Sequence, residues 1–266
     1  MTAEVLFERF REHWRAIAWW SLGIGVFVTV TLVFYPSIRD SAGLSTYAEK
    51  LPESMRALFI GGELDLTSPV GYLNSQIFAL MAPILLAVFA ISTGASSIAG
   101  DEENGALDLG LAQPVSRTSM VIQLFFWLSA GVFMLSAVLL ASVVVASIPF
   151  DLHVSFENLL AVTISTGLFG LMFGSVALTV GCFAPGRNRA VAIAASAALA
   201  SWMLDGLAKS VSWLEPFQVL SPYHQAFGQS PLTNGYPWAG WAVMAVVIAA
   251  LVGSSVFALN RRDVHQ

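Results

Sequence analysis

Long stretches without a charged side chain dominate the hydrophobic pattern of the chain. Five ranges contain no Asp, Glu, Lys or Arg: 16–38, 66–100, 118–150, 158–186 and 216–260. A helix needs about 20 apolar residues to cross the hydrocarbon core of a membrane. The pattern predicts six such helices, at about residues 16–35, 71–96, 119–147, 159–183, 190–208 and 238–259. Runs such as 80–90 lack the alternation of a transmembrane barrel strand, so we predict an all-α, polytopic membrane protein.

The composition agrees with this class. Of the 266 residues, 56% are hydrophobic and 11% are charged, whereas soluble domains carry about 25% charged residues. So few charges exclude an ordinary soluble globule, and so many apolar residues exclude disorder. The net charge of −5 argues against nucleic acid as a partner, because phosphate binding needs a basic surface. The single cysteine, Cys182, cannot form an intrachain disulfide.

The distribution of arginine and lysine predicts the orientation in the membrane. Basic residues are enriched on the cytoplasmic side of membrane proteins, and an even number of spans places both termini on one side. With the termini inside, eight basic residues are cytoplasmic: Arg9, Arg11, Arg15, Arg117, Arg187, Arg189, Arg261 and Arg262. Four are outside: Arg39, Lys50, Arg56 and Lys209. We therefore expect cytoplasmic N- and C-termini.

Residues 2–15 combine charges with apolar side chains that share one side of a helix, including Phe7, Phe10 and Trp14. This predicts an interfacial helix that lies on the membrane before the first span; a charged, frayed terminus is the alternative. The outer segment 40–69 contains an amphipathic pattern over 47–60, where we expect a helix on the outer surface.

Small residues predict how two spans pack. Gly170 and Gly174 have the small-xxx-small spacing that lets helices approach closely. In the span 190–208, the first half, residues 190–200, consists almost entirely of Ala, Val, Ile and Ser. Such a surface gains less from lipid than a leucine-rich one, so we expect this span to lie inside the bundle.

Motifs for nucleotide binding and common catalytic chemistry are absent from the sequence. It contains no G-x-x-x-x-G-K-[ST], H-E-x-x-H, C-x-x-C or G-x-S-x-G. The four histidines are scattered, which disfavours a metal site. Asp205, near the outer end of its span, is the candidate intramembrane charge, and Lys209 at i+4 predicts a boundary ion pair.

The loop between the second and third spans carries an unusual cluster. Asp101, Glu102 and Glu103 adjoin a long apolar helix, and Leu107, Leu109 and Leu111 follow before Pro114. Anionic lipids make the cytoplasmic membrane surface negative, so these acids are better placed against basic side chains of another protein. These residues are compatible with two interpretations. The loop is either an element that docks on another protein, or a solvated loop whose leucines touch the lipid headgroups.

This loop contains two short motifs: Gly-Asp-Glu-Glu-Asn-Gly-Ala-Leu-Asp-Leu at 100–109 and Pro-Val-Ser-Arg at 114–117. Together they resemble the GEE-x-G-T-L-x-L-L-L-x-x-P-V-S-R signature of type 2 ABC transporter permeases. Similarity extends upstream through 68–73 and 82–83, and motif-level resemblance covers about residues 59–123. It is looser downstream, at 221–223 and 231–232, and the six-span layout covers the chain. Asn104, Gly110 and Gln123 depart from the family pattern, in which basic, leucine and lysine residues are common.

The resemblance implies a single transmembrane domain, 1–266, with a cytoplasmic coupling loop at 98–113 and an outer re-entrant loop at 209–237. Trp213, Leu214, Phe217, Pro222 and Phe227 would line its short helices. It further implies that two permease copies pair and that a separate ATPase subunit holds ATP and Mg, with no cofactor in this chain. The residues implied to couple to that ATPase are Asp101, Glu102, Glu103, Gly105, Leu107, Leu109, Pro114 and Arg117.

The expected function is that of a non-catalytic permease subunit of an ABC exporter in a prokaryotic plasma membrane. Because the spans carry no charged residue in mid-membrane, we expect a hydrophobic or amphipathic solute. Ser and Thr side chains, Asn74 and Gln76 would be its polar contacts, and Pro83 would be a kink where the second span bends. The alternative is an ATP-independent membrane protein, either a secondary transporter or an assembly factor. Scarce buried charge disfavours the former, and the acidic-leucine loop has no evident purpose in the latter.

Overall fold

The computed structural model describes residues 2–39, 52, 55, 67–100, 116–150, 152, 154–184 and 186–261, with the side chains of 2–13, 99 and 100 left out. Within these residues the chain is helical and contains no strand. Six segments are long and apolar enough to cross a membrane: Trp14–Arg39, Pro69–Ile98, Arg117–Phe150, Phe156–Phe183, Arg187–Ala208 and Trp238–Arg261. The predicted all-α, six-span fold class is therefore confirmed.

The described elements follow one another as short and long helices. They are α1 (Thr2–Val33), α2 (Tyr35–Arg39), α5 (Pro69–Leu73), the π-helix η1 (Asn74–Phe78), α6 (Met81–Ala95), the π-helix η2 (Ser96–Gly100), α9 (Arg117–Ser147), the 3-10 helix η3 (Ile148–Phe150), α10 (Phe156–Phe183), α11 (Arg187–Ala208), the 3-10 helix η4 (Glu215–Leu220), α12 (Pro222–Phe227), α13 (Pro231–Asn234) and α14 (Trp238–Arg261). The segment 47–60, where an outer helix is predicted, lies largely outside the described residues.

Serine caps and prolines explain where several helices begin. The hydroxyl oxygens of Ser68, Ser116 and Ser221 accept hydrogen bonds from the backbone N–H groups three residues later. Pro69 and Pro222 follow two of these caps, at a position where the missing N–H of proline costs no helical bond.

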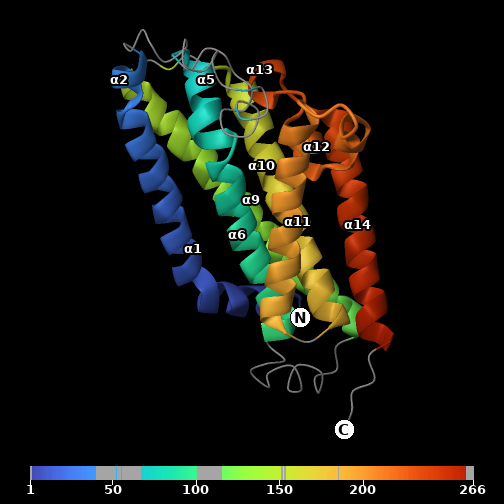
Figure 1. The fold of residues 1–266 in the computed structure, drawn as a ribbon. Coiled ribbons are helices and arrows are strands. Elements are labelled where there is room, and N and C mark those ends of the chain that lie inside the picture. The colour runs from blue at the N-terminus through green and yellow to red at the C-terminus, as the bar shows by residue number, and fades with distance from the viewer. Residues whose placement is uncertain are drawn as a thin grey trace.

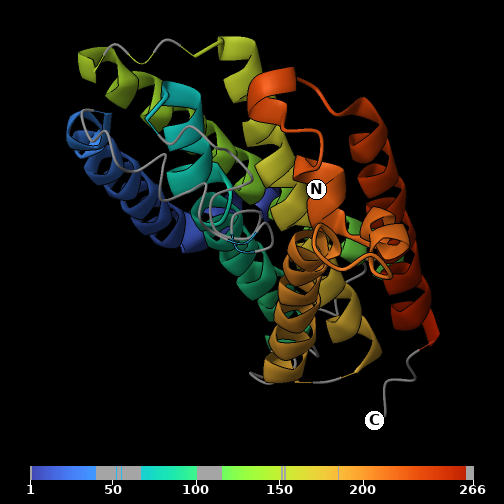
Figure 2. The ribbon, with the colours of Figure 1, turned by 45° about the horizontal axis from the view of Figure 1, so that its top comes forward.

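The bundle has two chemically different ends. At one end, called here the basic end, α1, α9 and α11 begin and α6, α10 and α14 finish (Figure 1). Arg117 and Arg187 are the first residues of α9 and α11, Arg189 follows in the first turn of α11, and Arg261 is the last residue of α14. Arg15 stands at the start of the first apolar span. The first turns of α1 run across this end rather than along the bundle (Figure 1), which is the direction that an interfacial segment requires. At the opposite end, called the re-entrant end, η4, α12 and α13 fold back between α11 and α14 (Figure 2).

Helix α10 forms the centre of the bundle and packs against α6, α9, α11, α12, α13 and α14. Its glycines let α6 approach unusually closely. A Cβ on Gly170 would lie 3.1 Å from the Leu86 carbonyl, and one on Gly174 would lie 2.9 Å from the Ala90 Cβ. The close approach predicted for these two glycines is confirmed.

Helix α11 lies at the edge of the bundle (Figure 2). It packs on α6 and α10 along one face, while only 28% of its most apolar stretch is buried, against 78% for α10. The prediction that this span lies inside the bundle is therefore wrong for the single chain. Small side chains allow close packing, but they do not determine on how many sides a helix has neighbours.

Candidate functional site

The second membrane-spanning segment is interrupted near its middle. The π-helix η1 ends with a bond from the Ala79 N–H to the Asn74 carbonyl, 2.7 Å, and α-helical bonding resumes with the Ile84 N–H and the Leu80 carbonyl, 3.0 Å. Between them, Pro83 has no N–H to donate to the carbonyl of Ala79, four residues earlier. Leu80 accordingly leaves helical geometry, with φ −140° and ψ −54°. The Ala79 carbonyl therefore needs a donor from outside its own helix.

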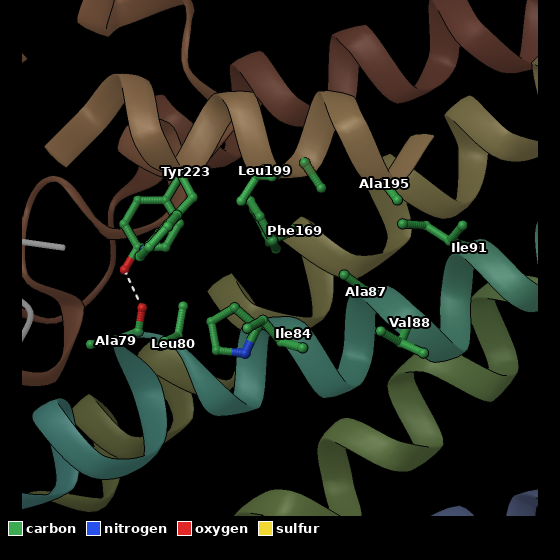
Figure 3. Close-up of a pocket in the computed structure, with 13 residues that line it drawn as sticks. Ala79, Leu80, Ile84, Ala87, Val88, Ile91, Phe169, Ala195, Leu199 and Tyr223 are labelled. Atoms are coloured by element: carbon green, nitrogen blue, oxygen red, sulfur yellow. Dashed lines mark hydrogen bonds between the residues drawn. The ribbon is translucent and has the colours of Figure 1, made fainter. Parts of the chain in front are cut away.

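Tyr223 supplies that donor. Its hydroxyl donates a hydrogen bond to the Ala79 carbonyl at 2.5 Å, across 144 positions of the chain (Figure 3). The residue is buried, and burial, with a smaller effect from the negative charge of Asp205, raises the pKa of Tyr223 well above its ordinary value. The phenol thus stays protonated and remains a hydrogen-bond donor.

A cavity of about 310 Å³ begins at this hydrogen bond and runs between α6 and α11 toward the basic end (Figure 3). Its wall is almost entirely apolar, and Phe169 of α10 forms part of it. The lining residues are Ala79, Leu80, Pro83, Ile84, Ala87, Val88, Ile91, Phe169, Ala195, Ala198, Leu199, Trp202 and Tyr223.

The mouth of the cavity opens sideways from the bundle. Ile84, Val88 and Leu199, which lie on both of its long walls, are 44–55% exposed. At the re-entrant end the ring of Tyr223 is fixed edge-on against Phe169, with ring centres 5.8 Å apart. The cavity can therefore accept an apolar group from the side, while Tyr223 and Ala79 close its re-entrant end.

Polar contacts of the buried residues Asp205 and Ser201 hold α12, and with it Tyr223, against α11. The carboxylate of Asp205 accepts from His224 Nδ1 at 2.8 Å and from Gln218 Nε2 at 2.9 Å, and Lys209 Nζ lies 3.5 Å away. One turn earlier, the Ser201 hydroxyl accepts from the backbone N–H of Tyr223 at 2.9 Å. The predicted Asp205–Lys209 pair is confirmed, and it belongs to a larger network.

A profile of the family described as ABC-2 family transporter protein matches residues 8–264, nearly the whole chain. The chain belongs to this family. A comparison with curated proteins finds no significant match. Membership confirms the resemblance to type 2 ABC transporter permeases, and it implies a membrane subunit that works with an ATP-binding subunit.

Most of the predicted coupling residues lie outside the described part of this ABC-2 family chain. They are Asp101, Glu102, Glu103, Gly105, Leu107, Leu109 and Pro114. Arg117 is described at the start of α9, where its guanidinium donates to the Leu259 carbonyl at 3.0 Å. Arg117 thus supplies a hydrogen-bond donor to one of the last carbonyls of α14, which have no donor within their own helix.

The predicted pathway residues occupy different surroundings. Pro83 lines the cavity and is buried. Asn74 and Gln76 lie one turn or more before the break, on η1, and neither belongs to the described lining. Sequence reasoning missed Tyr223, Phe169 and Trp202 as lining residues; the Ser-Pro-Tyr motif at 221–223 was the available signal, but it does not name the carbonyl that Tyr223 binds.

Proposed function

We propose that this chain is the permease subunit of an ATP-driven exporter of hydrophobic or amphipathic solutes, such as a drug, an antibiotic or a lipid-like molecule. A separate ATPase subunit would bind ATP and Mg, and this chain would hold no cofactor. The observation that carries the proposal is the apolar, side-opening cavity between α6 and α11 in a chain of the ABC-2 family.

The cavity supports this choice of solute. Binding sites for small molecules commonly enclose about 300–1,000 Å³ and are mostly apolar, and this cavity lies at the lower end of that range. Each CH₂ group that leaves water contributes about 0.8 kcal/mol, so the wall favours alkyl and aromatic groups. Because the mouth faces sideways, a solute dissolved in the membrane has a direct route into it.

The connections of α6 and α11 support mechanical coupling. Helix α6 forms one wall of the cavity and continues into η2, which contains the first residues of the predicted coupling loop. Arg187, the first residue of α11, donates from Nε to the Ser96 hydroxyl of η2 at 3.1 Å. Movement of the loop would thus reach both walls. ATP binding must favour one arrangement of these walls over another, because equal affinity for both would shift nothing.

The proposed assembly contains two permease copies and two ATPase subunits in a prokaryotic plasma membrane. The basic end would face the cytoplasm, with both termini, because arginines concentrate there. The acidic residues Asp101, Glu102 and Glu103, with Leu107 and Leu109, would contact the ATPase.

The test is to purify the chain together with an ATPase encoded beside it, place the complex in lipid vesicles, and measure solute-stimulated ATP hydrolysis. We expect stimulation by apolar amines or detergent-like drugs, and loss of most of it in Ala195→Phe, which fills the cavity. Ala200→Phe is the matched control, because Ala200 is exposed on the same helix and does not line the cavity. Stoichiometric ATP binding by the isolated chain, or transport driven without ATP, would overturn the proposal.

A further inference from the structure

We infer that the Tyr223 hydroxyl and the Ala79 carbonyl determine specificity: the cavity selects amphipathic solutes with an apolar body and one terminal hydroxyl-like group, which inserts between these two atoms. The inference rests on the proposed function, since it takes the cavity as the solute site. It adds the chemistry of the polar end of that solute.

The carbonyl of Ala79 needs a hydrogen-bond donor from another part of the chain, because the residue four positions later is a proline. Pro83 cannot donate to it, and the hydroxyl of Tyr223 lies 2.5 Å away. Both atoms lie at one end of a cavity whose remaining wall is almost entirely apolar (Figure 3). When a solute displaces the Tyr223 hydroxyl, the carbonyl loses its donor in surroundings that offer few replacements. Leaving a buried acceptor unpaired is unfavourable.

A hydroxyl group resolves this loss in a way that other groups cannot. It has one hydrogen to donate and lone pairs to accept, so it can donate to the Ala79 carbonyl while it accepts from Tyr223. A methyl ether of the same size accepts from Tyr223 but leaves the carbonyl unpaired. An alkane pairs with neither. The cavity should therefore rank an alcohol above its methyl ether, although both have the same apolar body.

The surrounding contacts keep this polar end in one place. The backbone N–H of Tyr223 is held by Ser201, and the neighbouring His224 is held by Asp205 at 2.8 Å. Phe169 and Phe227 pack against the Tyr223 ring, with ring centres 5.8 Å and 4.8 Å away. A phenol fixed in this way can discriminate between solutes by geometry, because displacing it requires a specific replacement.

The test uses the full-length chain in lipid nanodiscs and two photoreactive probes, a long-chain alcohol bearing a diazirine and its methyl ether. Crosslinked residues are located by mass spectrometry. We expect the alcohol to label α6 and α11 along the cavity about fivefold more than the ether, the ratio given by one hydrogen bond of ordinary strength. In Tyr223→Phe the carbonyl is permanently unpaired, so alcohol labelling should rise several-fold while ether labelling stays constant.

Two further variants make the result specific. In Pro83→Ala the new backbone N–H supplies the missing donor, so the preference for the alcohol should disappear even if Tyr223→Phe proves unstable. Tyr72→Phe is the matched control, because it removes another phenol-to-carbonyl bond, from Tyr72 to Thr31, away from the cavity; the preference should persist.

The outcomes separate this inference from the proposed function. Equal labelling of the cavity by both probes would overturn the selection by Tyr223 and Ala79 and leave the apolar binding site intact. Preference for the alcohol that survives Pro83→Ala would also overturn it. Absence of labelling by either probe along α6 and α11 would reject the cavity as a solute site, and with it both proposals.

Discussion

Pro83 is a single residue whose effect extends well beyond its own turn of helix. Because proline has no N–H, Pro83 interrupts the helical hydrogen bonds of the second span, and the Ala79 carbonyl accepts from Tyr223 instead. The resulting contact joins the turn between η1 and α6 to α12 and closes one end of the cavity. Prolines in membrane helices are tolerated when a neighbouring group satisfies the released carbonyl, and the phenol of Tyr223 has this role here.

The ionisation of Tyr223 gives a direct measure of this environment. Burial and the charge of Asp205 raise the pKa of Tyr223, so the folded protein keeps this proton above pH about 10, where an ordinary tyrosine loses it. The stabilisation is present below that pH and decreases above it, because the unfolded chain then loses a proton that the folded chain retains. In an ultraviolet titration, Tyr223→Phe should leave the ionisation amplitude of the folded protein near pH 10 unchanged and lower it in denaturant. A smaller amplitude in the folded variant would contradict the buried placement.

Asp205 provides a second prediction at this scale. Removing its carboxylate in Asp205→Ala leaves the donors of Gln218 and His224 without their acceptor, at a cost of about 1–3 kcal/mol. Thermal unfolding of the detergent-solubilised chain should occur at a clearly lower temperature. Glu215→Ala, which removes an exposed carboxylate from η4, should change stability by less than about 0.5 kcal/mol. Equal behaviour of the two variants would mean that the network does not hold α12 in place.

At the scale of elements, α6 and α10 form the most extensive helix–helix contact among the described residues. Backbone approaches backbone at Gly94, Gly170 and Gly174, where side chains are absent. Because membrane helices gain no hydrophobic energy from leaving lipid, such close packing is a principal source of their association. A rigid α6–α10 pair then provides the surface against which α11 and α12 form the cavity.

Gly94→Ala tests this interface. A Cβ at this position would overlap the carbonyl oxygen of Gly174, which belongs to backbone and cannot move aside cheaply. We expect a loss of stability of about 1–3 kcal/mol, the usual cost of overpacking, seen as earlier unfolding in a thermal scan of the purified chain. Gly253→Ala is the control, since nothing lies within 4 Å of a Cβ there, and it should be neutral or slightly stabilising. Tolerance of both substitutions would show that the helices separate more readily than this packing implies.

At the scale of the whole molecule, the proposed mechanism would transmit a movement of the basic end to the walls of the cavity. Both ends of the segment that contains the predicted coupling loop are fixed to other helices, by Arg187 to Ser96 and by Arg117 to Leu259. A displacement of this segment would therefore move α11 and α14 as well as α6 and α9. This arrangement links the basic end to both long walls of the cavity through η2 and the first residue of α11.

Charge reversal in the loop tests the coupling at this scale. Glu102→Lys with Glu103→Lys should lower ATP-dependent transport roughly tenfold, within the usual range of coupling energies, because these changes would remove the proposed acidic contact with the ATPase. Inserted protein and basal ATP hydrolysis should remain. Glu157→Lys, an exposed change at the start of α10 on the other end of the bundle, serves as the control and should transport normally. Unchanged transport by the double variant would remove the case for docking at these residues.

The sequence alone determined the helical class, the six apolar segments, the family resemblance and the close approach at Gly170 and Gly174. These properties depend on local hydrophobic length and residue spacing, which can be read along one segment of chain. The tertiary structure decided that α11 lies at the edge, that Tyr223 binds the carbonyl released by Pro83, and that Asp205 has His224 and Gln218 as partners. Those contacts join segments between 13 and 144 positions apart, and they exist only because helix packing brings their surfaces together.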